Sequence, residues 1–354
     1  MDLISSSHDG CRIGNRRNHF EWWYFDLDLK SRRRVYIEWH APIFNLRDDF
    51  CMLIIRIHDG GRTPQNNQRG KLGQLVEKAF RYPRADVSQS ETVCRIVFPA
   101  GHIVERDNGY SISVEEKGLL IDLELERCLP PVSIGDEVLY YSENRQEFFS
   151  WYVPLPKAST RGRIKFDDEH IEADGIAYHD HNWGNINVGK CLGGWVWTRV
   201  AFTNLTLIFG DITVKELKKS IPLLILLDKD GHRINVALSR VKYSQEKLDE
   251  LYNVSVPTDL LISFVGDVKY EVRLKFEDSS VIQEFPLASF ESHKLNSLMT
   301  SAYYLLKLDR APNCIKKLLG RALYFQFGVI GELYIDDQSV DTGKGVVEVL
   351  SCGS

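Results

Sequence analysis

Residues 178–183 are the chain's densest run of side chains that could do chemistry. They read Y-H-D-H-N-W and are followed by Gly184. Two imidazoles, a carboxylate and an amide each need a partner if they are buried. The tryptophan beside them, and Trp195 and Trp197 farther on, argue against full exposure. We therefore expect this stretch to line a site where polar groups meet an apolar cavity.

The first chemical interpretation is a metal site. Strand alternation divides the run between two faces, with His179, His181 and Trp183 on one and Tyr178, Asp180 and Asn182 on the other. A His-x-His pair then points two imidazoles the same way, but a metal site needs further ligands. Glu172 and His170 are near in sequence, and nothing fixes them beside the pair. We expect no metal and no other cofactor.

The second interpretation is acid–base catalysis. A carboxylate in a tryptophan-rich pocket can stay protonated near neutral pH because desolvation raises its pKa. Such an acid can protonate a carbon–carbon double bond, and aromatic faces stabilise the resulting cation. The candidate acids are Asp180, Glu21 and Glu38, with Tyr178 beside them as a further catalytic candidate. The histidines that could relay protons or act as base are His179, His181 and His40.

The candidate substrate-binding groups are aromatic or polar neighbours of these acids. They are Trp22, Trp23, Tyr24, Trp39, His40, Asn182, Trp183, Trp195 and Trp197. A structural alternative stays open, in which Asp180 caps a turn and the histidines bond backbone carbonyls where strands cross. Taken alone, Trp22 and Trp23 fit a core better than a cation site, since large aromatics dominate cores.

Strands must position these residues in the first half of the chain. Alternation from Phe20 to Leu29 places Glu21, Trp23 and Phe25 on one face, and Val35 to Phe44 follows as the return strand of a hairpin. Further strands are expected at Met52–His58, Thr92–Phe98, Ile103–Arg106, Tyr110–Glu115, Leu119–Arg127, Phe148–Val153, Arg163–Phe166 and His170–Ala173. This spacing predicts a β-meander that closes into a barrel or sandwich.

The second half continues the all-β pattern. Strands are expected at Trp195–Phe202, Leu205–Val214, Leu223–Asp228, His232–Tyr243, Asp259–Val265, Tyr270–Phe276, Tyr324–Ile335 and Gly345–Leu350. Helices are expected at Ser244–Asn253, Leu295–Leu308 and Pro312–Phe325, the first from its Ser cap and the last from an N1 proline. We predict a β domain over 1–190 and a second over 191–354, with a helical insertion near 295–325.

Composition narrows the function classes. The chain has 354 residues and a net charge of -5, which gives no electrostatic footprint for nucleic acid. Its start lacks the basic and apolar regions of a signal peptide. The seven cysteines form no C-x-x-C pair, which favours reduced thiols in a cytoplasmic protein. The motifs G-x-S-x-G, P-loop and G-x-G-x-x-G are absent, which argues against serine hydrolysis, phosphoryl transfer and hydride transfer.

Four motifs together resemble one family. They are Glu21-Trp22-Trp23-Tyr24-Phe25, then Trp151 with Pro154 and Pro156, then Tyr178 to Gly184, and then Gly194-Trp195-Val196-Trp197. They are similar to the lipocalin-like family of carotenoid 1,2-hydratases (hydroxyneurosporene synthases) and AttH-like proteins. Gly345 to Glu348 is similar to that family's closing strand.

The resemblance implies two consecutive lipocalin-like β-barrels, a hydrophobic pocket and cofactor-free chemistry on lipophilic polyenes. In the hydratases water adds across a terminal isoprenoid double bond, with an acidic residue as the proposed proton donor. Fungal relatives are pericyclases that close decalin rings by intramolecular Diels–Alder reaction, and others cyclise terpenoids. Our leading hypothesis is proton-initiated hydration or cyclisation of a hydrophobic small molecule. A pericyclase is the alternative, and a non-catalytic carrier of lipophilic ligands ranks third. We expect no obligate protein partner, and peripheral membrane contact would serve substrate access.

Overall fold

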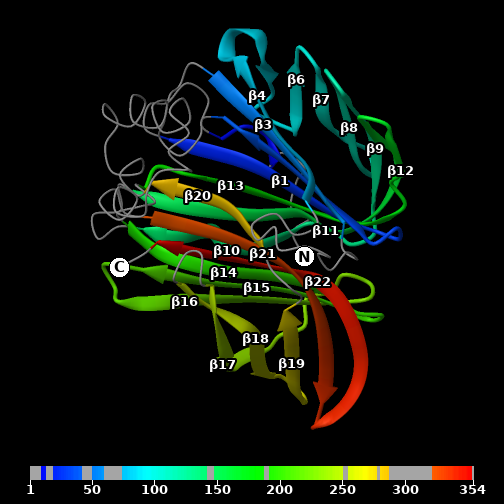
Figure 1. Cartoon of the computed structure of the whole chain (residues 1–354). Coiled ribbons are helices and arrows are strands. Elements are labelled where there is room, and N and C mark those ends of the chain that lie inside the picture. Colours follow the sequence, from blue (N-terminus) through cyan, green and yellow to red (C-terminus); the bar gives the residue numbers. More distant parts are fainter. Residues whose placement is uncertain are drawn as a thin grey trace. The chain divides into compact units, whose positions relative to one another are not determined.

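The computed structural model describes residues 9–12, 19–41, 50–59, 74–141, 147–186, 191–249, 254–276, 280–286 and 321–352. Its strands form two sheets (Figure 1). The chain divides into two compact units, which we treat separately. Unit 1 holds the described residues up to Cys191, and unit 2 runs from Leu192 to Phe285 and resumes at Arg321. The predicted all-β, two-barrel class is confirmed. Within the described ranges, no helix has the length and apolar character to cross a membrane.

Unit 1 contains a 13-stranded sheet. Its order is β4 (Gln74–Pro83), β3 (Phe50–Asp59), β2 (Arg33–His40), β1 (Phe20–Leu29), β13 (Gly175–Gly184), β11 (Phe148–Phe166), β9 (Leu119–Arg127), β8 (Gly109–Glu116), β7 (Gly101–Arg106), β6 (Arg95–Phe98) and β5 (Ser88–Gln89). Strands β10 (Val132–Tyr141) and β12 (Glu169–Glu172) also pair with β11, and a 3₁₀ helix, Arg84–Asp86, follows β4. Strand β13 therefore lies between β1 and β11, in the middle of the sheet.

One face of this sheet, called the inner face below, carries the core of unit 1. Alternation along β1 and β2 places Phe25, Leu27, Ile37 and Trp39 there, all fully or almost fully buried. The opposite face is called the outer face. The predicted hairpin and its apolar row are confirmed by the pairing of Trp23 with Trp39 and of Phe25 with Ile37.

The expected end of the strand at Pro154 is wrong. Strand β11 continues through Pro154 and Pro156 to Phe166. Its pairing with β13 shifts register between Tyr152 and Leu155 and again between Leu155 and Ala158. Proline lacks the N–H that a regular ladder uses, so it is tolerated where the ladder is irregular.

Unit 2 contains a nine-stranded sheet. Its order is β16 (Lys219–Asp228), β15 (Leu205–Val214), β14 (Leu192–Ala201), β22 (Gln338–Cys352), β21 (Arg321–Ile335), β19 (Lys269–Phe276), β18 (Val254–Val265) and β17 (Ala237–Asp249), and β20 (Ser280–Pro286) pairs with β21. The long β21 and β22 form the orange and red pair in Figure 1. Phe209, Ile262, Phe264 and Phe325 are fully buried in its core.

The predicted helix at Ser244–Asn253 is wrong over its described part. Residues 244–249 continue β17 and pair with β18, from Ser244 with Asp259 to Asp249 with Val254. The spacing of Leu248 and Leu251 satisfied a helical pattern, but pairing in the sheet overrides such a short local signal. The expected helix Leu295–Leu308 lies outside the described residues, as does Pro312–Phe325 up to residue 320. From Arg321 the latter is strand β21.

Gly109 offers a test of the close packing of β8 against β9. Its φ is +147°, and a Cβ there would lie 1.8 Å from the Leu125 carbonyl oxygen. We expect Gly109→Ala to lower the free energy of unfolding by about 3 kcal/mol, because strained φ and backbone clash add. Gly118→Ala is the matched control, with φ +70° and only Lys78 Nζ and Asp167 Oδ1 within contact. It should cost about 1 kcal/mol. Equal losses in urea titrations of the two variants would contradict the packing.

Candidate functional site

Strand β13 carries residues 178–183, and its neighbours fix the face that each side chain occupies. The register pairs Trp23 with His181 and Tyr24 with Asp180. Residues directly opposite in an antiparallel pair share a face. His181 therefore lies on the inner face and Asp180 on the outer face, which confirms the predicted alternation.

Asp9 meets both histidines on the inner face. Its side chain is 1% exposed. Oδ2 lies 3.1 Å from His179 Nε2 and accepts a 2.7 Å hydrogen bond from the Tyr110 hydroxyl. Oδ1 lies 3.2 Å from His181 Nδ1, an ion-pair contact that is not aligned as a hydrogen bond. The indole of Trp23 donates to the Asp9 carbonyl oxygen at 3.1 Å. Residues 9–12 are thus anchored inside unit 1.

Glu21 completes this inner network. Its Oε1 lies 2.8 Å from His181 Nε2 and accepts the backbone N–H of Arg12 at 2.7 Å. The thiol of Cys11 lies 3.2 Å from Oε2. His179 Nδ1 lies 2.9 Å from the Tyr24 carbonyl oxygen, which can only accept, so this nitrogen carries a proton. Two carboxylates and two imidazoles therefore bond one another in a buried space.

Opposing effects act on the pKa values of this network. Burial alone lowers the pKa of His181, but the contacts and negative charges of Asp9 and Glu21 outweigh it, so the pKa is raised. Burial alone raises the pKa of Asp9, but His179 and His181 outweigh it and lower the pKa far below its usual range. Asp9 is therefore ionised near neutral pH. It lies beside His181, whose raised pKa favours the protonated imidazole.

Several sequence candidates belong to this inner network or to the core beside it. They are Glu21, Trp23, Trp39, His179, His181 and Trp183, all buried. The rings of Trp23 and His181 stack at 4.3 Å, and those of Phe25 and His179 at 3.9 Å. Trp183 is not one of the rings around Asp180, since the two residues are on opposite faces of β13. We interpret the inner residues as supports of β13.

The outer face gathers the remaining unit 1 candidates in what we call the outer-face cluster. It consists of Trp22, Tyr24, Glu38, His40, Trp151, Tyr178, Asp180 and Asn182. In the register, Tyr24 lies between Glu38 and Asp180, while Asn182 lies between Trp22 and Trp151. These residues come from β2, β1, β13 and β11, so four strands must pair correctly to assemble the cluster.

Asp180 is held by two neutral donors from its own strand. The Tyr178 hydroxyl donates to Oδ2 at 3.0 Å, and the Asn182 amide donates to Oδ1 at 2.7 Å. Asp180 is 5% exposed. Both donors favour the charged carboxylate. Each oxygen of the Asp180 carboxylate therefore accepts a hydrogen bond from a neutral side chain.

Glu38 has a different environment on the same face. It forms an ion pair with Arg56, and its Oε2 lies 2.9 Å from His40 Nε2. Burial raises the pKa of Glu38, but Arg56 and His40 outweigh it and lower the pKa to about 2. Glu38 is therefore ionised near neutral pH and has no proton to donate.

Three important residues were missed from the sequence, and their signals differ. Arg56 interrupts the apolar strand Cys51–Ile57. A charged residue in such a strand indicates a buried ion pair, so the sequence did contain a signal for Arg56. Trp151 was noticed only as part of a family motif. It is 4% exposed, and its indole Nε1 is buried with no hydrogen-bond partner in the part of the chain that the structure describes. Asp9 lies in an aperiodic polar lead-in, where sequence patterns give no signal.

Two tryptophan candidates lie in unit 2, and so does a cluster of possible metal ligands. Trp195 and Trp197 are on β14 and are not part of the unit 1 cluster.

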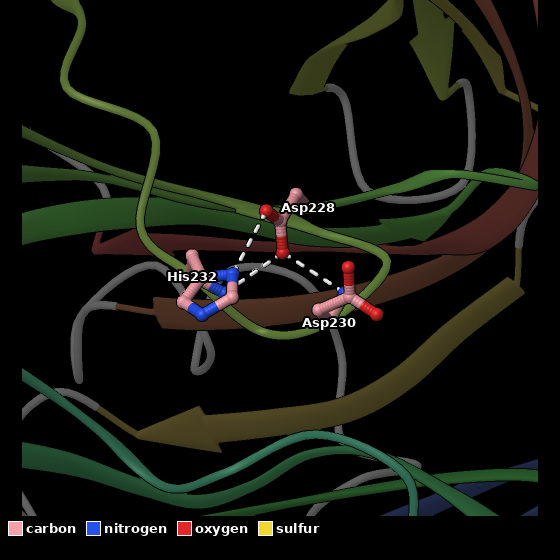
Figure 2. Close-up of side chains that lie close together, drawn as sticks. All are labelled: Asp228, Asp230 and His232. Atoms are coloured by element: carbon pink, nitrogen blue, oxygen red, sulfur yellow. Dashed lines mark hydrogen bonds and ion pairs between the residues drawn. The ribbon is translucent and has the colours of Figure 1, made fainter.

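Figure 2 shows Asp228, Asp230 and His232 gathered in the turn after β16. Asp228 Oδ1 accepts the backbone N–H groups of Asp230 and His232 at 2.9 and 2.8 Å. We assign this cluster to the stability of the turn.

Three solved structures share this fold. CghA matches with a TM-score of 0.61 and 11% identity, over 99% of this chain and 96% of that one. Kievitone hydratase from Nectria haematococca matches with 0.58 and 10%, over 99% and 93%. A putative AttH from Nitrosomonas europaea matches with 0.58 and 14%, over 96% and 94%. Identities this low establish the fold alone.

A family model described as AttH-like matches residues 76–286, which is more than half of the chain. The search of curated proteins gave no match. The matched stretch includes β11, β13 and the whole of residues 178–183.

The inner network predicts a loss of stability at alkaline pH. The pKa of His181 is higher in the folded than in the unfolded protein, so its contribution is fully present below the unfolded value of about 6.5. It is lost as pH rises through the folded value. Unfolding free energy should therefore fall above about pH 6.5, by up to roughly 1.4 kcal/mol per pH unit.

His181→Gln tests this in urea titrations across the same pH range. The variant should be less stable by roughly 3–5 kcal/mol near pH 6, because two buried carboxylates lose their partner. It should also show a shallower pH dependence. The control, His170→Gln, changes an exposed histidine on β12 and should match the wild type. An unchanged slope in His181→Gln would refute the assignment.

Proposed function

The chain belongs to the AttH-like family, and we propose that it is an enzyme that protonates a carbon–carbon double bond of a lipophilic small molecule. Hydration or cyclisation would follow, without a cofactor. The observation that carries the proposal is Asp180, a nearly buried carboxylate with a neutral hydrogen-bond donor on each oxygen. The fold shared with a protein named as a hydratase supports the reaction class, and CghA has also been solved with Sch210972.

The proposed reaction starts with Asp180 in its protonated form, which its burial favours against the effect of the two donors. The proton moves to one alkene carbon with the π electrons, which leaves a cation on the other carbon and a carboxylate on Asp180. Tyr178 and Asn182 then donate to the new anion, so their hydrogen bonds strengthen as charge develops. In hydration, water bonds to the cation and its extra proton returns to Asp180. In cyclisation, a second double bond of the substrate attacks the cation, and proton loss completes the reaction.

Glu38 and Glu21 are weaker candidate acids than Asp180, because both of them lie against groups that favour the ionised carboxylate. Glu38 is paired with Arg56, and its lowered pKa leaves no proton near neutral pH. Glu21 lies against His181 on the inner face. Asp180 alone of the three candidates has both of its described hydrogen bonds from neutral side chains.

Aromatic rings of the outer-face cluster suit a cationic intermediate. Trp22 and Tyr24 flank the Asn182 and Asp180 positions on β1. The ring of Trp22 lies 6.2 Å from His40 and 5.9 Å from Phe149, so it is packed on two sides. A fixed ring over a developing positive charge stabilises it by roughly 0.5–2 kcal/mol. We therefore propose Trp22 and Tyr24 as substrate contacts.

Trp151 favours a second candidate function, a pericyclase. Its indole N–H is an unused donor opposite Asn182. A Diels–Alder reaction needs no proton transfer, and it is accelerated by shape and by a donor to a carbonyl on the dienophile. Trp151 could supply that donor.

Replacing Asp180 by Asn separates these candidates. Asn keeps the size and hydrogen-bonding reach but has no transferable proton. If protonation starts the reaction, turnover should fall by about 100-fold to 10,000-fold with an unchanged melting temperature. Asp28→Asn is the matched control, since it makes the same change farther along the outer face of β1 and should retain activity.

The pericyclase predicts the opposite pattern. Asp180→Asn should then lose little activity, whereas Trp151→Phe, which removes only the N–H and some ring area, should lose roughly tenfold or more. Full activity in both variants would overturn both candidates. A fall in melting temperature that accounts for the lost activity of Asp180→Asn would assign Asp180 a structural role instead.

A further inference from the structure

On four neighbouring strands of unit 2, β16, β15, β14 and β22, the core-facing side chains become more accessible toward one end. Along β14, Val200 and Thr198 are fully buried, whereas Val196 is half-buried. Along β15, Phe209 is fully buried and Asp211, two residues farther on, is half-buried. The register pairs Val196 with Asp211, so both trends run toward the same end.

The neighbouring strands show the same trend. On β16, Leu226 is buried and Leu224 is half-buried, and the next residue of that row, Pro222, pairs with Asp211. On β22, Val347 is fully buried and Val349, which pairs with Val196, is 8% exposed. We call this end the unit 2 mouth and define it by Val196, Asp211, Leu224, Tyr243 and Val349.

Asp211 places a carboxylate among the apolar side chains of the mouth. The Tyr243 hydroxyl donates to its Oδ2 at 2.9 Å. Burial, followed by the charge of Asp211, raises the pKa of Tyr243 well above its usual value, so the hydroxyl stays a donor. Oδ1 of Asp211 is buried, and it has no hydrogen-bond partner among the described residues.

Three unit 1 carboxylates differ from Asp211, which accepts from the neutral Tyr243 hydroxyl. Asp9 and Glu21 lie against histidines, and Glu38 lies against Arg56 and His40. A buried carboxylate oxygen that accepts nothing carries a desolvation cost that a bound donor would relieve. Oδ1 of Asp211 is such an oxygen, and it lies at the end of the unit 2 core where apolar side chains are partly exposed.

We propose that the unit 2 mouth binds an apolar molecule whose head group carries a hydrogen-bond donor. The head group, an alcohol or an ammonium, donates to Asp211 Oδ1, and the apolar part packs against Val196, Leu224 and Val349. An anionic head group is disfavoured, because it would face the Asp211 carboxylate. The residues of this site belong to unit 2, and the proposal does not depend on the function proposed for the outer-face cluster.

The test uses three ligands with the same chain, decylamine, decanol and decanoic acid. Each displaces the fluorescent hydrocarbon diphenylhexatriene from the full-length protein near pH 7. We expect the amine and the alcohol to displace the probe at concentrations at least about tenfold below the acid, the difference made by one hydrogen bond to a charged group. Equal displacement by all three would overturn the proposal.

Variants locate the effect. Asp211→Asn removes the charge and should bring the amine and the acid to within a few-fold of each other. Tyr243→Phe leaves the carboxylate in place and should keep the preference for the amine. Asp267→Asn is the control, because it removes an exposed carboxylate from the same unit.

If Asp211→Asn lowers the melting temperature but keeps the preference for the amine, Asp211 is only a structural partner of Tyr243. A preference that disappears in Asp180→Asn instead would place the ligand in unit 1. Either result overturns the proposal.

Discussion

The placement of His181 between two buried carboxylates is the interaction on which unit 1 depends. A buried ion pair contributes little when it is compared with an apolar core, but the loss of one partner is costly. Asp9, Glu21 and His181 therefore tolerate little change in position. Because they hold one face of β13, they also fix the register of that strand. The residues that alternate with the histidines are placed by the same constraint.

That coupling explains why one short run can carry two kinds of chemistry. Toward the inner face, its imidazoles meet acids and stacked aromatic rings, and the groups satisfy one another. Toward the outer face, Asp180 accepts hydrogen bonds from Tyr178 and Asn182. The pKa of Glu38 shows the contrast on that same face, since Arg56 and His40 beside it keep it ionised.

Local alternation predicted the parts of this arrangement that a single strand determines. The sequence predicted the strand Phe20–Leu29 and the two faces of residues 178–183. It also showed almost no helical periodicity before Ser244. Partners across the sheet were not readable: nothing near Asp9 indicates His179, which lies 170 residues away. Proline at 154 and leucines near 248 gave misleading signals, because bulges and sheet pairing are tertiary effects that override local preference.

The central claim is that the outer-face cluster transfers a proton to a carbon atom of its substrate. The most direct test is a turnover in D₂O on terminal isoprenoid alkenes, with product analysis by mass spectrometry and NMR. Proton-initiated hydration or cyclisation predicts one deuterium bonded to carbon at the former double bond, and its incorporation should fall with turnover in Asp180→Asn. A product formed at full rate with no carbon-bound deuterium would contradict the claim.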